Sequence, residues 1–240
     1  RELLAAGATV DLAMGKERVT VLMYAAGNNW LDAVRLLFEF NANPNVVNKY
    51  GCTALHYAAQ EGHTAMTRLL VEHGADLNVQ NVNGHKALHT AAEKGNIECV
   101  HILLDSGAEI DLVNKKGRTP AKLALLMRHF PTLELLLRYG ADAHLAAVLP
   151  ADMTIASEEE KREASGILGA LNQQPSVIHL LADHGGICQK EELDYQVSFN
   201  GCTEVLRALR QVGCDAWCSG SSRINMLRKR HRIDSTKLLG

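Results

Sequence analysis

The sequence of 240 residues lacks the features of several protein classes. No stretch approaches 18 consecutive apolar residues, and the N-terminus has no apolar signal-peptide core, so we expect neither a membrane span nor secretion. The six cysteines form no CxxC pair and no dense framework, which indicates reduced thiols in a cytoplasmic or nuclear protein. A formal net charge of −2 excludes a globally basic nucleic-acid binder.

Sequence motifs of catalysis are also missing. There is no HExxH, no GxSxG and no glycine-rich phosphate-binding loop, and the eleven histidines do not recur with carboxylates at ligand spacing. Cys214 and Cys218 have a spacing within the range of zinc sites. Cys214, however, stands at a small, buried type of position, which favours packed thiols. We therefore expect no enzymatic activity, no metal and no cofactor.

What the sequence does contain is a repeat of 33 residues. The string TALHYAA at Thr53–Ala59 returns as KALHTAA at Lys86–Ala92, and the same frame holds TVLMYAA at Thr20–Ala26 and TPAKLAL at Thr119–Leu125. A second marker, Gly-Ala before an acidic residue, keeps the same period from Gly74 to Gly107 and Gly140. Two markers in phase over four units predict a repeat architecture.

Each repeat predicts two short helices. In the clearest copy, Thr53 is expected to cap a first helix over Ala54–Gln60 through its hydroxyl, and Gly62 to end it. A second helix is expected over Thr64–His73, with Leu69 on its apolar face. The polar residues that follow predict a projecting turn. Neither helix is long enough to be stable alone, so each unit should be stable only against its neighbours.

These features resemble the ankyrin-repeat family, whose unit has 33 residues and a T-P-L-H-x-A-A core. The resemblance implies an all-α fold class, an ankyrin-repeat solenoid of stacked helix-turn-helix units with projecting turns. It also implies structural hydrogen bonds for Thr53, His56 and His89. The chain departs from the family pattern at four places, where Met23 and Lys122 replace the His, Lys86 the Thr and Ala121 the Leu.

The repeat divides the chain into four parts. We expect a partial first unit at 1–14, four regular units at 15–146, two degenerate units at 147–219 and a basic C-terminal cap or tail at 220–240. The first degenerate unit should carry an insertion within 142–161, after which Ser157 would start a long first helix through 158–171. Residues 1–7 resemble the end of a helix whose partner lies upstream, which predicts a module excised from a longer chain.

The resemblance also implies where a partner binds, because the concave face of an ankyrin solenoid is built from turn tips and first helices. The residues in those positions are Lys16, Glu17, Asn28, Trp30, Lys49, Tyr50, Tyr57, Gln60, Glu61, Asn83, His85, Thr90, Glu93, Lys94, Lys115, Lys116 and Arg118, with Cys52, Val82, Leu126 and Met127 beside them. Interface energy concentrates on Tyr, Trp and Arg.

We call this set of residues the strip, and two of its features leave alternatives open. Tyr24 and Trp30 would either add aromatic area to the strip or pack between units. The basic residues of the fifth unit, Lys115 to Arg118, would complement an acidic stretch in the partner. The acidic run Glu158–Glu163 is interpreted as the solvated side of a helix.

The favoured function is that of a protein–protein interaction module, a scaffold, adaptor or targeting domain that binds a protein or peptide as a monomeric part of a longer chain. The first alternative is a regulatory domain of an enzyme or channel that acts on its own chain. The second rests on the basic run Leu227–Arg232, whose Arg228–Arg232 segment could contact chromatin, nucleic acid or an anionic membrane, or serve as a nuclear-import signal. A solvated terminal helix or tail is the plainer interpretation of that run.

The sequence predicts one covalent modification. Ankyrin repeats resemble substrates of an asparagine hydroxylase that favours Leu, five residues, an acidic residue, an aliphatic residue and Asn, and this order is met by Leu70, Asp76, Leu77 and Asn78. Asn45 has a weaker match. Mass spectrometry of the protein from animal cells should find one added oxygen on the peptide that contains Asn78. If that peptide carries no added oxygen, Asn78 serves only to hydrogen-bond its own turn.

Overall fold

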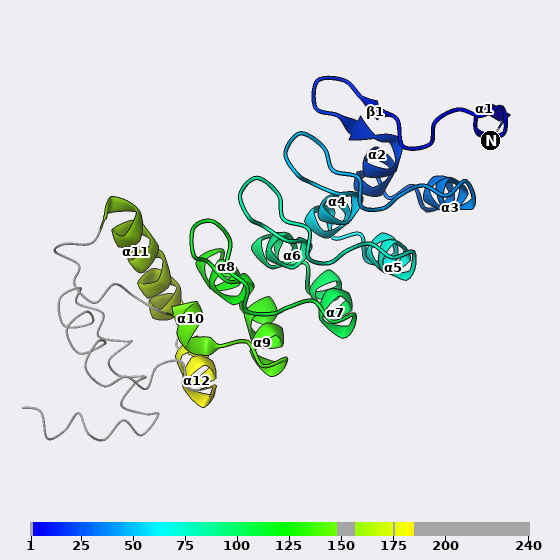
Figure 1. The fold of residues 1–240 in the computed structure, drawn as a ribbon. Coiled ribbons are helices and arrows are strands. Elements are labelled where there is room, and N and C mark those ends of the chain that lie inside the picture. Colours follow the sequence, from blue (N-terminus) through cyan, green and yellow to red (C-terminus); the bar gives the residue numbers. More distant parts are fainter. Residues whose placement is uncertain (1, 148–156, 175, 185–240) are drawn as a thin grey trace, which may run out of the picture.

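The computed structural model describes residues 2–147, 157–174 and 176–184, and its helices lie in two rows (Figure 1). The inner row holds α2 (Val21–Gly27), α4 (Ala54–Glu61), α6 (Ala87–Lys94) and α8 (Pro120–Leu126). The outer row holds α3 (Leu31–Glu39), α5 (Thr64–Glu72), α7 (Ile97–Asp105) and α9 (Phe130–Arg138). We call these four helix pairs units two to five. The expected all-α solenoid is confirmed.

Further elements lie at the two ends of the rows. The short helix α1 (Glu2–Ala5) precedes a hairpin of β1 (Ala13–Met14) and β2 (Val19–Thr20). At the other end, α10 (Ala143–Ala147) and α11 (Glu158–Gln173) contact α8, and α12 (Ser176–Asp183) contacts α9 and α10. Helix α11 therefore continues the inner row, and α12 continues the outer row (Figure 1).

The inner helices begin at N-caps with extended backbone, at Thr20, Thr53, Lys86 and Thr119. The hydroxyls of Thr20 and Thr119 accept the backbone N–H three residues on, at 3.2 Å in both. At Thr53 the hydroxyl lies 3.0 Å from the ring Nδ1 of the histidine three residues on. Lys86 has no hydroxyl, and its backbone N–H donates to the equivalent ring at 3.3 Å. The repeated histidines thus help to fix the helix starts.

Left-handed backbone recurs at the same places in each unit. Gly51, Gly84 and Gly117 turn the projecting tips with φ of 73°, 74° and 68°. At Gly84 the constraint is also steric, since a Cβ atom would lie 2.8 Å from a backbone nitrogen of the next tip. All four described non-glycine residues with positive φ occupy glycine positions of the repeat, at Arg18, Asn29, Asn41 and Arg128. Units two and five therefore keep the backbone of the repeat where its glycine is lost.

The core is continuous along the stack. Alanines at one position of the repeat, Ala25, Ala58, Ala91 and Ala124, are fully buried and let neighbouring inner helices approach closely. Larger side chains fill the space beside the outer helices. Leu69 is 3% exposed and Leu103 is fully buried, as their positions in the repeat predict.

Helix α11 is about twice as long as the regular inner helices, with 16 residues against 7 or 8. It begins after Ser157, as expected from the sequence. Ser157 Oγ accepts the N–H of Glu160 at 3.2 Å, and Glu160 Oε2 accepts the N–H of Ser157 at 2.7 Å, which is a capping box. Its buried face holds Ala164, Ile167, Ala170 and Leu171. The expected seventh unit, Cys214, Cys218 and the basic tail lie outside the described residues.

Leu69→Ala and Leu103→Ala should each lower the free energy of unfolding by roughly 2–5 kcal/mol, because each leaves a cavity in the packed core. Urea unfolding followed by circular dichroism measures this loss. Leu12→Ala is the matched control, since Leu12 is 59% exposed and its loss should cost less than about 0.5 kcal/mol. Equal effects for buried and exposed leucines would show that the apolar faces are wrongly assigned.

Candidate functional site

A repeated asparagine shapes each projecting tip. Asn48, Asn81 and Asn114 each accept, through Oδ1, the backbone N–H groups two and four residues on, at 2.8–3.0 Å. These carboxamides are largely shielded from solvent, so the hydrogen bonds fix the tip conformation. This role was not predicted from the sequence, although asparagine recurs there every 33 residues.

Backbone hydrogen bonds then join successive tips. The N–H of Lys49 donates to Glu17 O at 3.0 Å, and the N–H of Val82 donates to Tyr50 O at 2.8 Å. The N–H of Lys115 donates to Asn83 O at 3.0 Å in the same way. The tip side chains are therefore held in a row at fixed spacing along the concave face.

A pocket of about 260 Å³ lies between the tips of units three and four and helix α4. Its lining consists of two tyrosines, a valine, a cysteine and polar side chains: Tyr50, Cys52, His56, Tyr57, Gln60, Asn81, Val82 and Asn83. Six of these eight belong to the strip predicted from the sequence. His56 and Asn81 were not predicted as part of it.

The two tyrosines of this pocket are held in place by hydrogen bonds. Tyr57 OH accepts from Asn48 Nδ2 at 2.9 Å, and burial raises the pKa of Tyr57. Its ring lies beside Gly27 of α2, so it also contacts the preceding unit. Tyr50 OH donates to Glu17 Oε1 at 2.9 Å, while 42% of the residue stays exposed. Both rings are pre-positioned, which reduces the entropy lost when a partner binds.

The charges beside Tyr50 neutralise one another. Lys49 Nζ lies 3.3 Å from Glu17 Oε1 and 4.6 Å from the centroid of the Tyr50 ring. Hydrogen bonds from Tyr50 and then Lys49 lower the pKa of Glu17, and contact with Tyr50 is the main cause that raises the pKa of Lys49. This end of the strip is therefore an ordered aromatic surface with little net charge.

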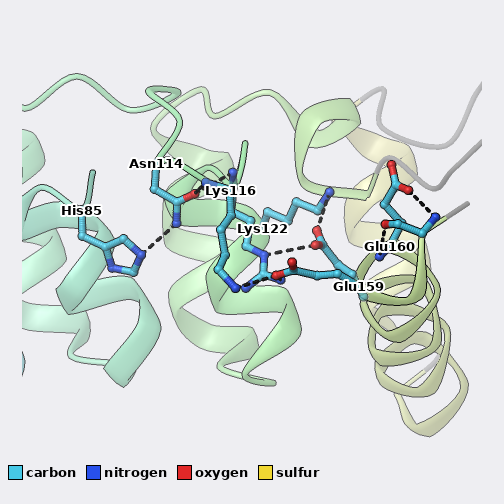
Figure 2. A network of polar contacts seen from close by, with 9 residues as sticks. His85, Asn114, Lys116, Lys122, Glu159 and Glu160 are labelled. Atoms are coloured by element: carbon cyan, nitrogen blue, oxygen red, sulfur yellow. Dashed lines mark hydrogen bonds and ion pairs between the residues drawn. The ribbon is translucent and has the colours of Figure 1, made fainter. Parts of the chain in front are cut away.

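Histidines connect units three to five. His56 Nε2 lies 3.0 Å from His85 O, and His85 Nε2 accepts from Asn114 Nδ2 at 2.8 Å (Figure 2). His85 Nδ1 faces Glu93 Oε2 at 3.6 Å. Burial lowers the pKa of His56 and of His85, and it lowers the pKa of the almost fully enclosed His89 to about 4. These rings are therefore neutral near pH 7 and have a structural role.

Two of the basic residues that we expected to complement an acidic partner, Lys116 and Arg118, are paired with α11, as is Lys122 (Figure 2). Lys116 pairs with Glu159, Arg118 Nε lies 3.1 Å from Glu163 Oε2, and Lys122 Nζ lies 2.7 Å from Glu163 Oε1. The acidic run of α11 is thus more than a solvated face. Packing of α11 onto α8 brings the opposite charges together, which the repeat pattern alone does not show.

The remaining predicted positions divide by exposure. The prediction that Thr90 belongs to the strip is wrong, because the residue is only 8% exposed and its hydroxyl donates to Lys86 O at 3.3 Å. Tyr24 and Trp30 are 57% and 53% exposed and form an edge-to-face pair. They are therefore not packed between units among the described residues. Other exposed positions of the strip are Lys16, Asn28, Glu61, Lys94, Lys115 and Met127, while Glu93 and Leu126 are half-buried.

Asn78, the candidate for hydroxylation, is exposed, and its side chain is hydrogen-bonded. Its Oδ1 accepts from Lys86 Nζ at 2.9 Å, at the start of the next inner helix, and its backbone N–H donates to Asp76 Oδ1 at 2.8 Å within its own turn. Its modification stays a prediction.

Two general properties of the described residues bear on the chemistry. No three His, Cys, Asp or Glu side chains within them gather as a metal ion would require. Within the same ranges, no helix is long and apolar enough to cross a membrane.

Comparison with known proteins places the repeat in a family. A family model described as ankyrin repeats, in three copies, matches residues 1–81 and 74–147. These matches cover more than half of the 240 residues. No curated protein matches the chain.

The buried histidine predicts a pH dependence of stability. Because the pKa of His89 is about 4 in the folded chain and about 6.5 when unfolded, the unfolded state takes up the proton first as the pH falls. Stability is then full above pH 6.5 and declines towards pH 4. Between pH 7 and pH 5, urea unfolding should show a loss on the order of 1–2 kcal/mol in wild type that His89→Gln lacks. Equal losses in both proteins would contradict this assignment.

Proposed function

Because the chain belongs to the ankyrin-repeat family, whose repeats are generally protein–protein interaction modules, we propose that it binds a protein or peptide on the concave face of units two to four. The observation that carries this proposal is the pocket where two tips and α4 bring Tyr50, Tyr57, Val82 and Asn83 together. The family is typically non-catalytic, and we propose that this chain likewise acts by binding.

The pocket favours an uncharged side chain in the partner. Its aromatic and aliphatic residues offer apolar contact, and the carboxamides of Gln60 and Asn83 offer hydrogen bonds to a peptide backbone. The nearest ion pair, Glu17 with Lys49, is satisfied within the chain. Recognition here would depend on shape and apolar area more than on charge.

The wider role that fits this site is that of a scaffold, adaptor or targeting domain in the cytoplasm or nucleus. Both described cysteines, Cys52 and Cys99, are free thiols, which is typical of a reducing compartment. A regulatory role toward an enzyme or channel domain would use the same concave face. Contact of nucleic acid with Arg228–Arg232 is a separate proposal, which steeply salt-dependent binding would support.

The tyrosines provide the test of the proposed site. Peptides are first selected against the wild-type chain from a random library displayed on phage. They should bind the double variant Tyr50→Ala and Tyr57→Ala at least about tenfold more weakly than wild type, because anchor residues carry most interface energy. Fluorescence anisotropy with the synthesised peptides measures this loss.

Tyr139→Ala is the matched control. Tyr139 is 39% exposed and donates to Asp105 on the outer face, much as Tyr50 donates to Glu17 on the concave face. Its loss should leave peptide affinity unchanged, and unfolding midpoints show that all variants fold. Peptides that bind the double variant as tightly as wild type would place the site elsewhere.

A further inference from the structure

The basic residues of unit five occupy the same positions of the repeat as residues that line the pocket in unit three. Lys116, Arg118 and Lys122 stand two repeats after Tyr50, Cys52 and His56, which line that pocket. Unit five therefore carries three cations where unit three offers an uncharged pocket. A surface of this charge fits a ligand with carboxylates.

Helix α11 supplies such carboxylates. Glu159 and Glu163 are four residues apart, so they project from the same face of the helix one turn apart. Figure 2 shows Glu159 reaching from α11 towards unit five, where it pairs with Lys116 and lies near Arg118. Glu163 pairs with Arg118 and Lys122. The acidic first turns of α11 thus cover, in unit five, the positions that form the pocket in unit three.

The inner part of this contact is shielded from water. The side chains of Arg118, Lys122 and Glu163 are 18%, 12% and 13% exposed, so solvent screens these ion pairs little. The pair of Lys116 and Glu159 lies at the rim, with both side chains more than half exposed, and the hydrogen bond from Lys116 is the main cause that lowers the pKa of Glu159. The face of α11 that carries Glu159 and Glu163 is therefore complementary in charge to the basic residues of unit five.

The apolar residues of α11 lie further along the helix. Ala164, Ile167, Ala170 and Leu171 are buried, and a Cβ atom at Gly166 would lie 3.3 Å from Leu126 of α8. The first turns, before Ala164, contact unit five through the charged pairs. The two halves of α11 are thus attached by different interactions, ion pairs in its first turns and apolar packing further along.

We propose that the concave surface of unit five is a second binding site, for an acidic helical segment with carboxylates one turn apart, and that α11 is its internal ligand. A partner segment of this kind has to displace the first turns of α11. This site does not depend on the pocket of units three and four, so either proposal can fail alone.

The test uses a fluorescein-labelled synthetic peptide of residues 157–174 as the acidic ligand. Wild type should bind it weakly, because the tethered α11 has an effective concentration in the millimolar range. The full chain with Glu159→Lys and Glu163→Lys repels its own helix from unit five and should bind the peptide at least about tenfold more tightly. The milder pair Glu159→Gln and Glu163→Gln should also raise the affinity for the peptide. Because Gln keeps the size of the side chain and adds no positive charge, this pair is less prone to disturb folding.

Two control variants separate this mechanism from unspecific effects. Glu158→Lys changes the charge of the same turn at a residue that pairs with Lys161 of α11 rather than with unit five, and should bind like wild type. Arg118→Glu with Lys122→Glu also releases α11 but removes the site, and should not bind. If neither substitution pair at Glu159 and Glu163 binds more tightly than wild type, or if the Arg118 and Lys122 variant binds as well, α11 is only a structural cap and the proposal fails.

Discussion

Stacking of helix pairs is the interaction on which the rest of this structure depends. The helices of a single unit are too short to be stable alone, and the buried alanines of the inner row, such as Ala58 and Ala91, contact the next unit. The same stacking sets the spacing of the tips, which the asparagine carboxamides and the backbone bonds between tips then fix. The concave pocket exists because two neighbouring units meet there, and its geometry is therefore a property of the stack rather than of one repeat.

The concave face divides into two surfaces of different chemistry. Tyr50 and Tyr57 line an uncharged pocket at units three and four, while the equivalent strip of unit five is basic and covered by α11. A partner in the pocket would meet pre-positioned rings, whereas a partner at unit five would compete with Glu159 and Glu163. The repeat thus keeps one backbone and varies the side chains at fixed positions, which changes the surface from uncharged at unit three to basic at unit five.

Sequence periodicity was enough to predict the helix pairs, the buried Leu69 and the start of α11 at Ser157, because these follow from local patterns and capping. The resemblance to the ankyrin family supplied six of the eight residues that line the pocket, but not the pocket itself. It could not predict that Arg118 pairs with Glu163, because that contact needs the path of α11 across unit five. Thr90 was misassigned because a threonine at a nominally exposed helix position can turn its hydroxyl to the backbone of its own helix.

Amide hydrogen exchange with and without a library-derived peptide tests the central claim, that partners bind the concave face. Exchange reports local opening, which a bound partner suppresses where it contacts the chain. We predict slower exchange on binding at the tips and inner helices of units three and four, over residues 49–61 and 82–94. Exchange in the outer helices α5 and α7 should not change. Slowing confined to those outer helices, with none at the tips, would contradict the claim.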